Sequence, residues 1–293
     1  MVFLLKNNLL RRITIATLFL IVASILYKYP DNIKTIEYSD ANGNDIFLID
    51  KNGYVSLTKS KCLFDDNDVI NIINIYTNNH CIPDGFYSYL DSNIKVLSHS
   101  IKDNLLKIDF SKEFYNIKPG YEEKIIEMLV YSFTNLDNIY KVIFFVEGNI
   151  LDRIPNINKR INSVLDRGFG VNKVVEINTF NEVNQFNVYY LGKNDDDIYY
   201  IPVTYIVNED DVARMIISKL KSNNINSSLL THLNSNVEVV NYGIDNGEMD
   251  IVFNSNLNEL LIDGELKEEV KYSLEASFLD SFGVKNVEII ISG

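Results

Sequence analysis

Two segments of the chain have related sequences, and this internal duplication restricts the fold more than any other feature. When the sequence is shifted by 143 residues, positions 68–114 align with 211–257 without a gap and share eleven identical residues. After a two-residue insertion the alignment resumes, so that "VIFFVEG", which ends at Gly148, falls on "VEIIISG", which ends at Gly293. Self-similarity of this kind indicates copies of one structural unit. We therefore expect two domains of the same fold in tandem.

Each copy is expected to form a small unit of strands and helices. In the first copy, apolar and polar positions alternate on both sides of Asn52-Gly53, a dipeptide that favours a tight hairpin. Apolar residues at helical spacing then predict two helices, the first of which Asp65 or Asp66 could cap. The expected elements are strands at 45–50 and 53–58, a helix at 65–76, strands on both sides of a turn at 102–104, a helix at 121–136 and a strand at 142–147.

The second copy repeats this order, with Gly283 placed to end its last helix. Its expected elements are a helix at 208–220, strands at 236–244 and 248–253, a helix at 265–282 and a strand at 287–292. The predicted fold class is α+β, with two tandem β-α-β-β-α-β domains in which helices cover one face of a mixed sheet. Six apolar positions are shared by the copies and are expected in the cores: Val96, Ile108 and Phe110, with their counterparts Val239, Ile251 and Phe253.

The N-terminus carries a membrane-targeting pattern. Residues 13–27 form an uncharged apolar run that follows Lys6, Arg11 and Arg12. The run is short for about 30 Å of hydrocarbon, but basic flanks extend its reach. A cleaved signal peptide would need small residues before the cut, and "KYPDN" after the run has no such pattern. A signal anchor is therefore favoured over a signal peptide, and the positive flank predicts a single-pass protein of the cell membrane with its C-terminal region outside the cytoplasm.

The resulting segments are a signal anchor or signal peptide at 1–30, a first domain at 31–149, a linker at 150–183 and a second domain at 184–293. The linker carries a basic island, which includes Arg153, Lys159, Arg160 and Arg167. These residues could dock on an acidic partner or on the acidic face of a neighbouring domain, and the alternative is a solvated linker. The whole chain has a net charge of −13, which argues against nucleic acid as a partner.

The stretch "KIDFSKEF" at 107–114 gathers polar residues in a way that suggests a hydrolase site. In the second copy, however, Val252 replaces Asp109 and Asn254 replaces Ser111, while the apolar positions persist. The sequence also lacks a Gly-x-Ser-x-Gly elbow, a Walker loop and a dinucleotide-binding fingerprint. We therefore predict no catalytic residues and no cofactor, and an extracytoplasmic hydrolase is the least favoured of three hypotheses.

The two cysteines allow more than one interpretation. Cys62 and Cys81 could form one disulfide across a separation of 19 residues, or remain unpaired structural residues. His80 lies beside Cys81, but a zinc site needs four ligands and the spacing supplies no second pair. No metal site is predicted.

The run "SNIKVLSHSIKDNLLKIDFSKEF", followed by a helix pattern and "KVIFFVEGN", resembles the GerMN domain of sporulation and spore-germination proteins. The resemblance covers about 44–149 and, more loosely, 184–293. The matching positions are Val96, Leu97, Ile108, Asp109, Ser111, Glu113, Phe114, Val142, Val146 and Gly148 in the first copy, and Val239, Ile251, Phe253, Leu257, Val287, Ile291 and Gly293 in the second.

The resemblance implies a fold similar to ring-building motifs and a membrane-anchored, non-catalytic role in assembling the sporulation or spore-germination envelope. Its implied partners are other envelope or sporulation proteins, or further copies of the chain. The chain departs from lipoprotein members of the family because it has no cysteine just after the apolar run. The expected partner surface consists of Asp109, Ser111, Arg153, Lys159 and Arg160.

A second hypothesis is a cell-wall or polysaccharide-binding envelope protein, with peptidoglycan as the partner. It rests on the 18 tyrosines, whose rings could stack on sugars. The simpler interpretation of these tyrosines is that most lie in cores or on edge strands.

Overall fold

The computed structural model describes residues 44–62, 69–195, 197–221 and 228–292. The chain divides into two compact units, Met1–Ala41 and Asn42–Gly293, and all described residues belong to the second. The predicted membrane anchor and the predicted caps Asp65 and Asp66 lie outside the described residues. Within the described ranges, no helix has the length and apolar character needed to cross a membrane.

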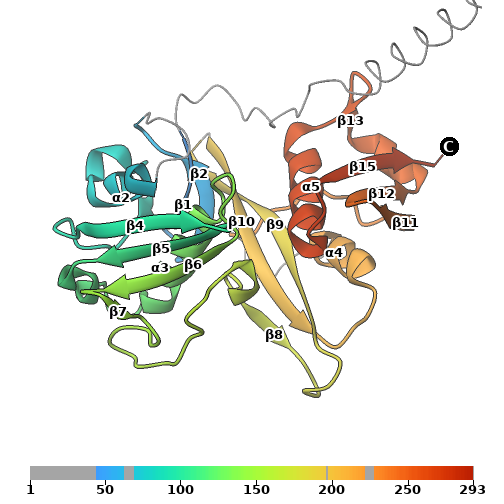
Figure 1. Cartoon of the computed structure of the whole chain (residues 1–293). Coiled ribbons are helices and arrows are strands. Elements are labelled where there is room, and N and C mark those ends of the chain that lie inside the picture. The colour runs from blue at the N-terminus through green and yellow to red at the C-terminus, as the bar shows by residue number, and fades with distance from the viewer. Residues whose placement is uncertain (1–43, 63–68, 196, 222–227, 293) are drawn as a thin grey trace, which may run out of the picture. The chain divides into compact units, whose positions relative to one another are not determined.

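The first copy contains the expected succession of strands and helices (Figure 1). Gly53 adopts a positive φ of 84° in the predicted turn between the first two strands. The elements are β1 (Asp45–Asp50), β2 (Val55–Lys59), α2 (Val69–Thr77), β3 (Phe86–Tyr87), β4 (Val96–Lys102), β5 (Leu105–Phe110), α3 (Glu122–Phe133), β6 (Lys141–Val146) and β7 (Asn149–Ile150). A 3-10 helix, η2 (Lys112–Asn116), connects β5 to the approach of α3.

The second copy has the same arrangement, preceded by η3 (Arg167–Phe169) and β8 (Val174–Glu176) in the connecting segment. Its helix α5 ends at Gly283, which is left-handed with φ 62° and donates its N–H to Leu279 O, as the sequence predicts. The elements are β9 (Asn184–Asn194), β10 (Asp197–Val207), α4 (Val212–Lys221), β11 (Val239–Asp245), β12 (Glu248–Phe253), η4 (Ser255–Leu260), β13 (Leu261–Ile262), β14 (Glu265–Leu266), α5 (Glu268–Phe282) and β15 (Asn286–Ile291).

The strand arrangement corrects the expectation of one mixed sheet per domain. Each copy has its own small mixed sheet, β4-β5-β6-β7 in the first and β11-β12-β15 in the second, while β1 and β2 join β10 in a separate sheet. Apart from the two-residue strands β3, β7, β13 and β14, each copy has the order β-β-α-β-β-α-β rather than β-α-β-β-α-β. The physical reason lies in α3, which buries ten of its twelve residues and so needs a sheet on each side. Phe47 of β1 packs on Tyr131 of α3, and Phe133 of α3 packs on Phe144 of β6.

The duplicated core positions are buried with one exception. Ile108, Phe110, Ile251 and Phe253 have no exposed surface, and Val239 is also buried. Val96 is only half-buried. It lies at the start of the edge strand β4, but its buried counterpart Val239 has the same position in β11, so the edge position alone does not account for the difference.

The same interruption occurs in both copies. The register of β4 against β5 shifts between Val96 and Ser98, and that of β11 against β12 shifts between Val239 and Asn241. These positions are 143 residues apart, the offset of the sequence repeat. In both copies the middle strand also pairs in parallel with the last strand, β5 with β6 and β12 with β15. Because bulges are conserved features of a fold, their recurrence confirms the duplication at the level of the backbone.

One sheet connects the two copies. Strand β10 pairs along its whole length with β9, and its other edge meets β2 at Tyr200–Leu57 and β8 at Tyr205–Val174. The pairing to β8 means that part of the predicted linker is built into this sheet. The two copies therefore share backbone structure across their boundary.

Candidate functional site

The expected partner residues Asp109 and Ser111 are both used inside the first copy. The Asp109 carboxylate accepts a hydrogen bond from Gly148 N–H at 3.1 Å, which holds the turn after β6. The Ser111 hydroxyl accepts from Lys95 N–H at 3.0 Å, and Ser111 is only 6% exposed. Ser111 therefore does not lie on an exposed surface, which corrects its placement there from sequence. Its burial follows from its position at the end of β5, where Lys95 continues the sheet.

The basic residues of the connecting segment lie together on one loop. The Arg153 guanidinium donates to the backbone oxygen of Asn158 at 3.0 Å. The backbones of Arg153 and Arg160 form an isolated antiparallel β-bridge. Lys159 forms an ion pair of 2.8 Å with Glu123 on α3. The loop thus docks on its own domain through Lys159, which is the intramolecular alternative stated above, and Arg160 is exposed.

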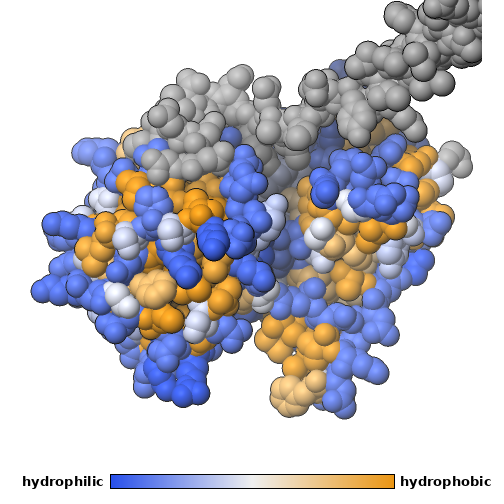
Figure 2. All heavy atoms as spheres, viewed as in Figure 1, coloured by the Kyte–Doolittle hydropathy of each residue, from blue (hydrophilic) through white to orange (hydrophobic). Residues whose placement is uncertain are grey.

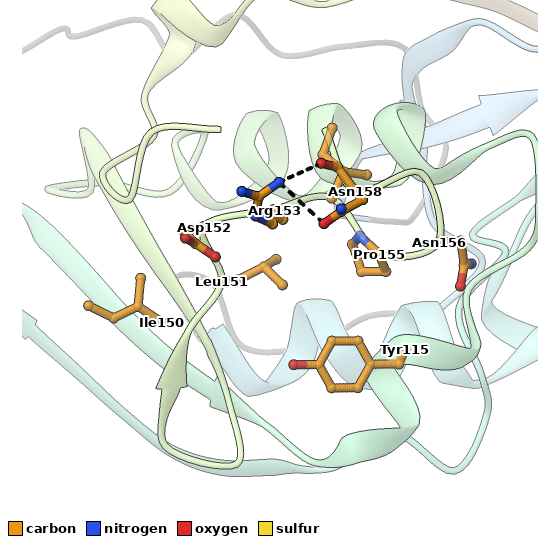
Figure 3. A pocket seen from close by; sticks show the side chains of 9 residues that line it. Tyr115, Ile150, Leu151, Asp152, Arg153, Pro155, Asn156 and Asn158 are labelled. Carbon is orange, nitrogen blue, oxygen red and sulfur yellow. Dashed lines mark hydrogen bonds between the residues drawn. The ribbon is translucent and has the colours of Figure 1, made fainter. Parts of the chain in front are cut away.

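A shallow hollow of about 250 Å³ lies between this loop and η2. Figure 3 shows Tyr115 on one side of it and the loop from Ile150 to Asn158 on the other, with Arg153 turned toward Asn158. Tyr115 and Ile150 are each about half exposed. The hollow is open, and Arg153 is bonded to Asn158, so its shape suits a docking surface better than a reaction site.

A network of charges surrounds the N-terminal part of α3. Lys173 pairs with Glu123 at 3.0 Å and with Glu127 at 2.8 Å, and Lys124 pairs with Glu127 at 3.2 Å. Burial raises the pKa of the Glu123 carboxyl, but hydrogen bonds from Lys159 and Lys173 outweigh it and lower that pKa overall. The network fastens the connecting segment to α3.

Asn172 is one densely bonded point of the boundary, and its side chain is buried between β2 and β10. Its amide oxygen accepts from Val55 N–H at 3.0 Å, and its amide nitrogen donates to Val55 O and Pro202 O, both at 2.7 Å. Continuing the register from Tyr200–Leu57 would place Pro202 opposite Val55. Because proline has no N–H, the side chain of Asn172 supplies the hydrogen bonds that the strand cannot.

A second polar group, which is partly buried, joins the connecting segment to both copies. The Arg167 guanidinium donates to Asp280 on α5 at 3.1 Å and to the Tyr189 hydroxyl on β9 at 3.1 Å. It also reaches Thr134 and Asn135 at the end of α3. Burial lowers the pKa of Arg167, but Asp280 raises it, and the net direction is upward. Arg167 therefore remains charged and bridges α3 of the first copy to α5 of the second.

A cluster of tyrosines lies on the first copy. Tyr87 and Tyr89 stack at 5.0 Å, Tyr89 contacts Tyr121 at 4.4 Å, and the Lys118 ammonium lies 3.9 Å from the Tyr89 ring centroid. Burial and the neighbouring Tyr121 raise the pKa of Tyr89 to about 12. Tyr87 is 43% exposed, so one ring of the cluster is open to a ligand.

The described residues contain no group of three or more His, Cys, Asp or Glu side chains arranged to hold a metal ion. Cys62 and Cys81 are joined in a disulfide, which resolves the two interpretations of the sequence. His80, His99 and His232 are exposed and lie in three separate segments.

Sequence reasoning missed the two residues that matter most at the boundary. Asn172 shows no pattern that distinguishes it from other loop asparagines, and Asp280 is one acid among many on a helix. Arg167 belongs to the basic island, and that cluster of positive charge was the sequence feature that could have indicated contacts between the connecting segment and the domains.

Comparisons with known proteins agree with this architecture. The family model Germane, described as "Sporulation and spore germination", matches residues 47–152. The chain is 27% identical over 274 residues to the spore germination protein GerM of Bacillus subtilis (strain 168), covering 90% of this chain and 75% of that protein. It also matches the solved tandem GerMN domains of the sporulation protein GerM from Bacillus subtilis with a TM-score of 0.76 and 27% identity, covering 86% of this chain and 91% of that one.

Proposed function

Because this chain is a GerM-like sporulation and spore-germination protein with two tandem GerMN domains, we propose that it is a non-catalytic assembly protein of the spore envelope. In this proposal its N-terminal segment attaches it to the cell membrane, and its domains act outside the cytoplasm. It works by binding other envelope proteins or further copies of itself.

The observation that carries the proposal is the way the two copies are joined. The β2–β10 pairing, the buried side chain of Asn172 and the Arg167–Asp280 contact fix one copy against the other. A rigid double module holds its binding surfaces at a set spacing, which lowers the entropy cost of assembly. A hydrolase would instead need a nucleophile and a base within hydrogen-bond reach. The Ser111 hydroxyl does bond the Glu113 carboxylate, but Ser111 is only 6% exposed and also accepts from Lys95 N–H, and Asp109 accepts from Gly148 N–H, which suits a structural role for both residues.

The proposal can be tested by isolating the tagged full chain, after crosslinking, from sporulating cells of its source organism. We expect a defined set of envelope proteins to co-purify with it. Asp109→Asn and Ser111→Ala variants that remain folded should keep this set, since neither residue reacts. Recovery of cell-wall fragments without protein partners would contradict the assembly role, and loss of function in a folded Ser111→Ala variant would support an enzyme.

One observation favours the alternative of a polysaccharide-binding protein. The tyrosine cluster presents the half-exposed ring of Tyr87 beside the Lys118 ammonium, and aromatic rings stack on sugars. In a sedimentation assay with purified peptidoglycan, Tyr87→Ala should then lower binding several-fold. The matched control is Tyr140→Ala, since Tyr140 is 64% exposed and lies outside the cluster. Equal binding of wild type and both variants would exclude the cluster as a sugar site.

A further inference from the structure

The small sheet of each copy has one face covered by helices and one face turned away from them. In β5, Leu106, Ile108 and Phe110 have no exposed surface, so alternation places Leu105, Lys107 and Asp109 on the opposite side. We call this side of β4, β5 and β6 the first outer face, and the corresponding side of β11, β12 and β15 the second outer face. Figure 1 shows β4, β5 and β6 in front of α3, and Figure 2 shows hydrophobic and hydrophilic residues interleaved on the surface over these strands.

The first outer face is basic. Register places Lys102 and Lys141 on either side of Leu105, and Lys107 beside Ile143. All three lysines are exposed, and none forms an ion pair within the described part of the chain. The acidic group on this face is Asp109, which is half-buried and bonded to Gly148.

The second outer face has the opposite charge. Register places Asp245 beside Glu248, and Asp250 beside Glu288. These four carboxylates are exposed, and none has a cationic partner among the residues that the structure describes.

The reversal of charge occurs at equivalent positions of the two copies. With the repeat offset of 143, Lys102 corresponds to Asp245 and Lys107 to Asp250. Next to the charges, each face has an apolar strip, Ile143 and Phe145 on the first and Val252 and Ile290 on the second. Each face therefore combines apolar residues with unpaired charge of one sign, and the two faces complement each other.

We propose that the first outer face of one molecule binds the second outer face of another copy, so that the chain assembles head to tail. The two faces of one molecule belong to copies held together by the shared sheet, so each molecule keeps one basic and one acidic face available. Repeated contacts between two different surfaces of the same chain form a ring if the rotation from one molecule to the next returns to the first molecule. They form an open filament if it does not. This inference rests on the proposed function, because it names the chain itself as one assembly partner.

The area of the two outer faces limits how tightly two molecules can associate through them. Three strands about 4.8 Å apart and about six residues long cover roughly 14 by 20 Å, well below the ~800 Å² per partner of a stable interface. Exposed ion pairs contribute about 0.2–1 kcal/mol each and are screened over about 10 Å at 0.1 M salt. The contact should therefore be weak and salt-sensitive, and confinement of many copies on a membrane would strengthen it.

The test measures energy transfer between two fluorescently labelled pools of the full chain in a non-ionic detergent. Transfer should rise with protein concentration, and raising the salt from about 50 to about 500 mM should weaken the association about tenfold. Two charge-reversal variants then probe the faces. Lys107→Glu with Lys141→Glu makes the first face acidic, and Glu248→Lys with Asp250→Lys and Glu288→Lys makes the second face basic.

Each variant alone should lose energy transfer, because its two faces then carry the same sign. A mixture of the two variants, and a chain that combines all five substitutions, should regain it. The matched control is Lys193→Glu with Lys51→Glu, which changes net charge as much as the first-face variant, at exposed sites outside both faces, and should behave as wild type. Circular dichroism and the unfolding temperature verify that each variant is folded.

The inference is overturned if wild type shows no concentration-dependent transfer, if the control loses transfer as the face variants do, or if the mixture of folded variants fails to regain it. These outcomes are separable from the proposed function. If envelope proteins co-purify with the chain while self-association fails, the assembly role stands and this inference alone is lost.

Discussion

The side chain of Asn172 bonds both the backbone N–H and the backbone carbonyl of Val55, at 3.0 and 2.7 Å, and so acts as one more peptide unit beside β2. The same amide reaches Pro202 of the second copy. A single side chain thus completes the sheet where proline interrupts it. The rigidity on which the proposed function depends should therefore be sensitive to substitutions at a few buried polar positions.

Asn172→Gly should destabilise the protein by about 2–4 kcal/mol, because the buried N–H and carbonyl groups of Val55 lose their partner. Glycine is the informative substitution, since Asn172 has a φ of 48° and glycine adopts this conformation without strain. Asn156→Gly is the control, because Asn156 has a φ of 64° but is exposed. Urea unfolding measures the unfolding free energy of both variants. Equal stability of the two would contradict the bridging role of Asn172.

The contact between Arg167 and Asp280 provides a second prediction. Asp280→Asn should cost about 2–4 kcal/mol, because it leaves the guanidinium without its carboxylate in a largely buried site. Arg167→Lys should also destabilise, since an ammonium cannot reach Asp280, Tyr189 and Asn135 together. A double-mutant cycle from thermal unfolding should give a coupling energy above about 1 kcal/mol. Additive effects would show that the two residues act independently.

Gly192 on β9 lies opposite Tyr199 on β10, and a Cβ at this glycine would overlap the tyrosine ring. The ring cannot move aside freely, because the Tyr199 hydroxyl donates to Asp50 at 2.9 Å and the ring packs on Phe86. Gly192→Ala should therefore destabilise by about 1–3 kcal/mol. Gly243→Ala is the matched strand control, since a Cβ there meets nothing within 4 Å. A neutral Gly192→Ala would mean that Tyr199 is not held in place.

Glu123 predicts a pH dependence of stability. Its pKa is lowered in the folded protein, so its contribution is complete above the ordinary glutamate pKa of about 4.3 and is lost as the pH falls through the lower folded value. Glu123 is partly exposed, so solvent reduces the effect. Unfolding free energy measured between about pH 6 and 3 should fall less steeply in Glu123→Gln than in wild type. Glu238→Gln, at an exposed site, should leave the slope unchanged.

Much of the fold could be read from the sequence because the relevant signals are local and occur twice. The predicted strands at 45–50 and 248–253 coincide with β1 and β12, and the helix stop at Gly283 is confirmed. The predicted core residues Ile108, Phe110, Ile251 and Phe253 are fully buried. Alternation and helical spacing express which side of an element is apolar, and a second copy separates the shared apolar positions from the variable polar ones.

The sequence by itself therefore determined the duplication, the order of most elements, the apolar core and the resemblance to GerMN domains. It could not determine which sheet each strand joins, since β1 and β2 have the same alternation whether they pair within their own domain or meet β10. Only the tertiary structure decided this, together with the roles of Asn172, Arg167 and Asp280. Their contacts join residues from 22 to 117 positions apart, and the geometry that makes a polar side chain a bridge exists only after the chain has folded.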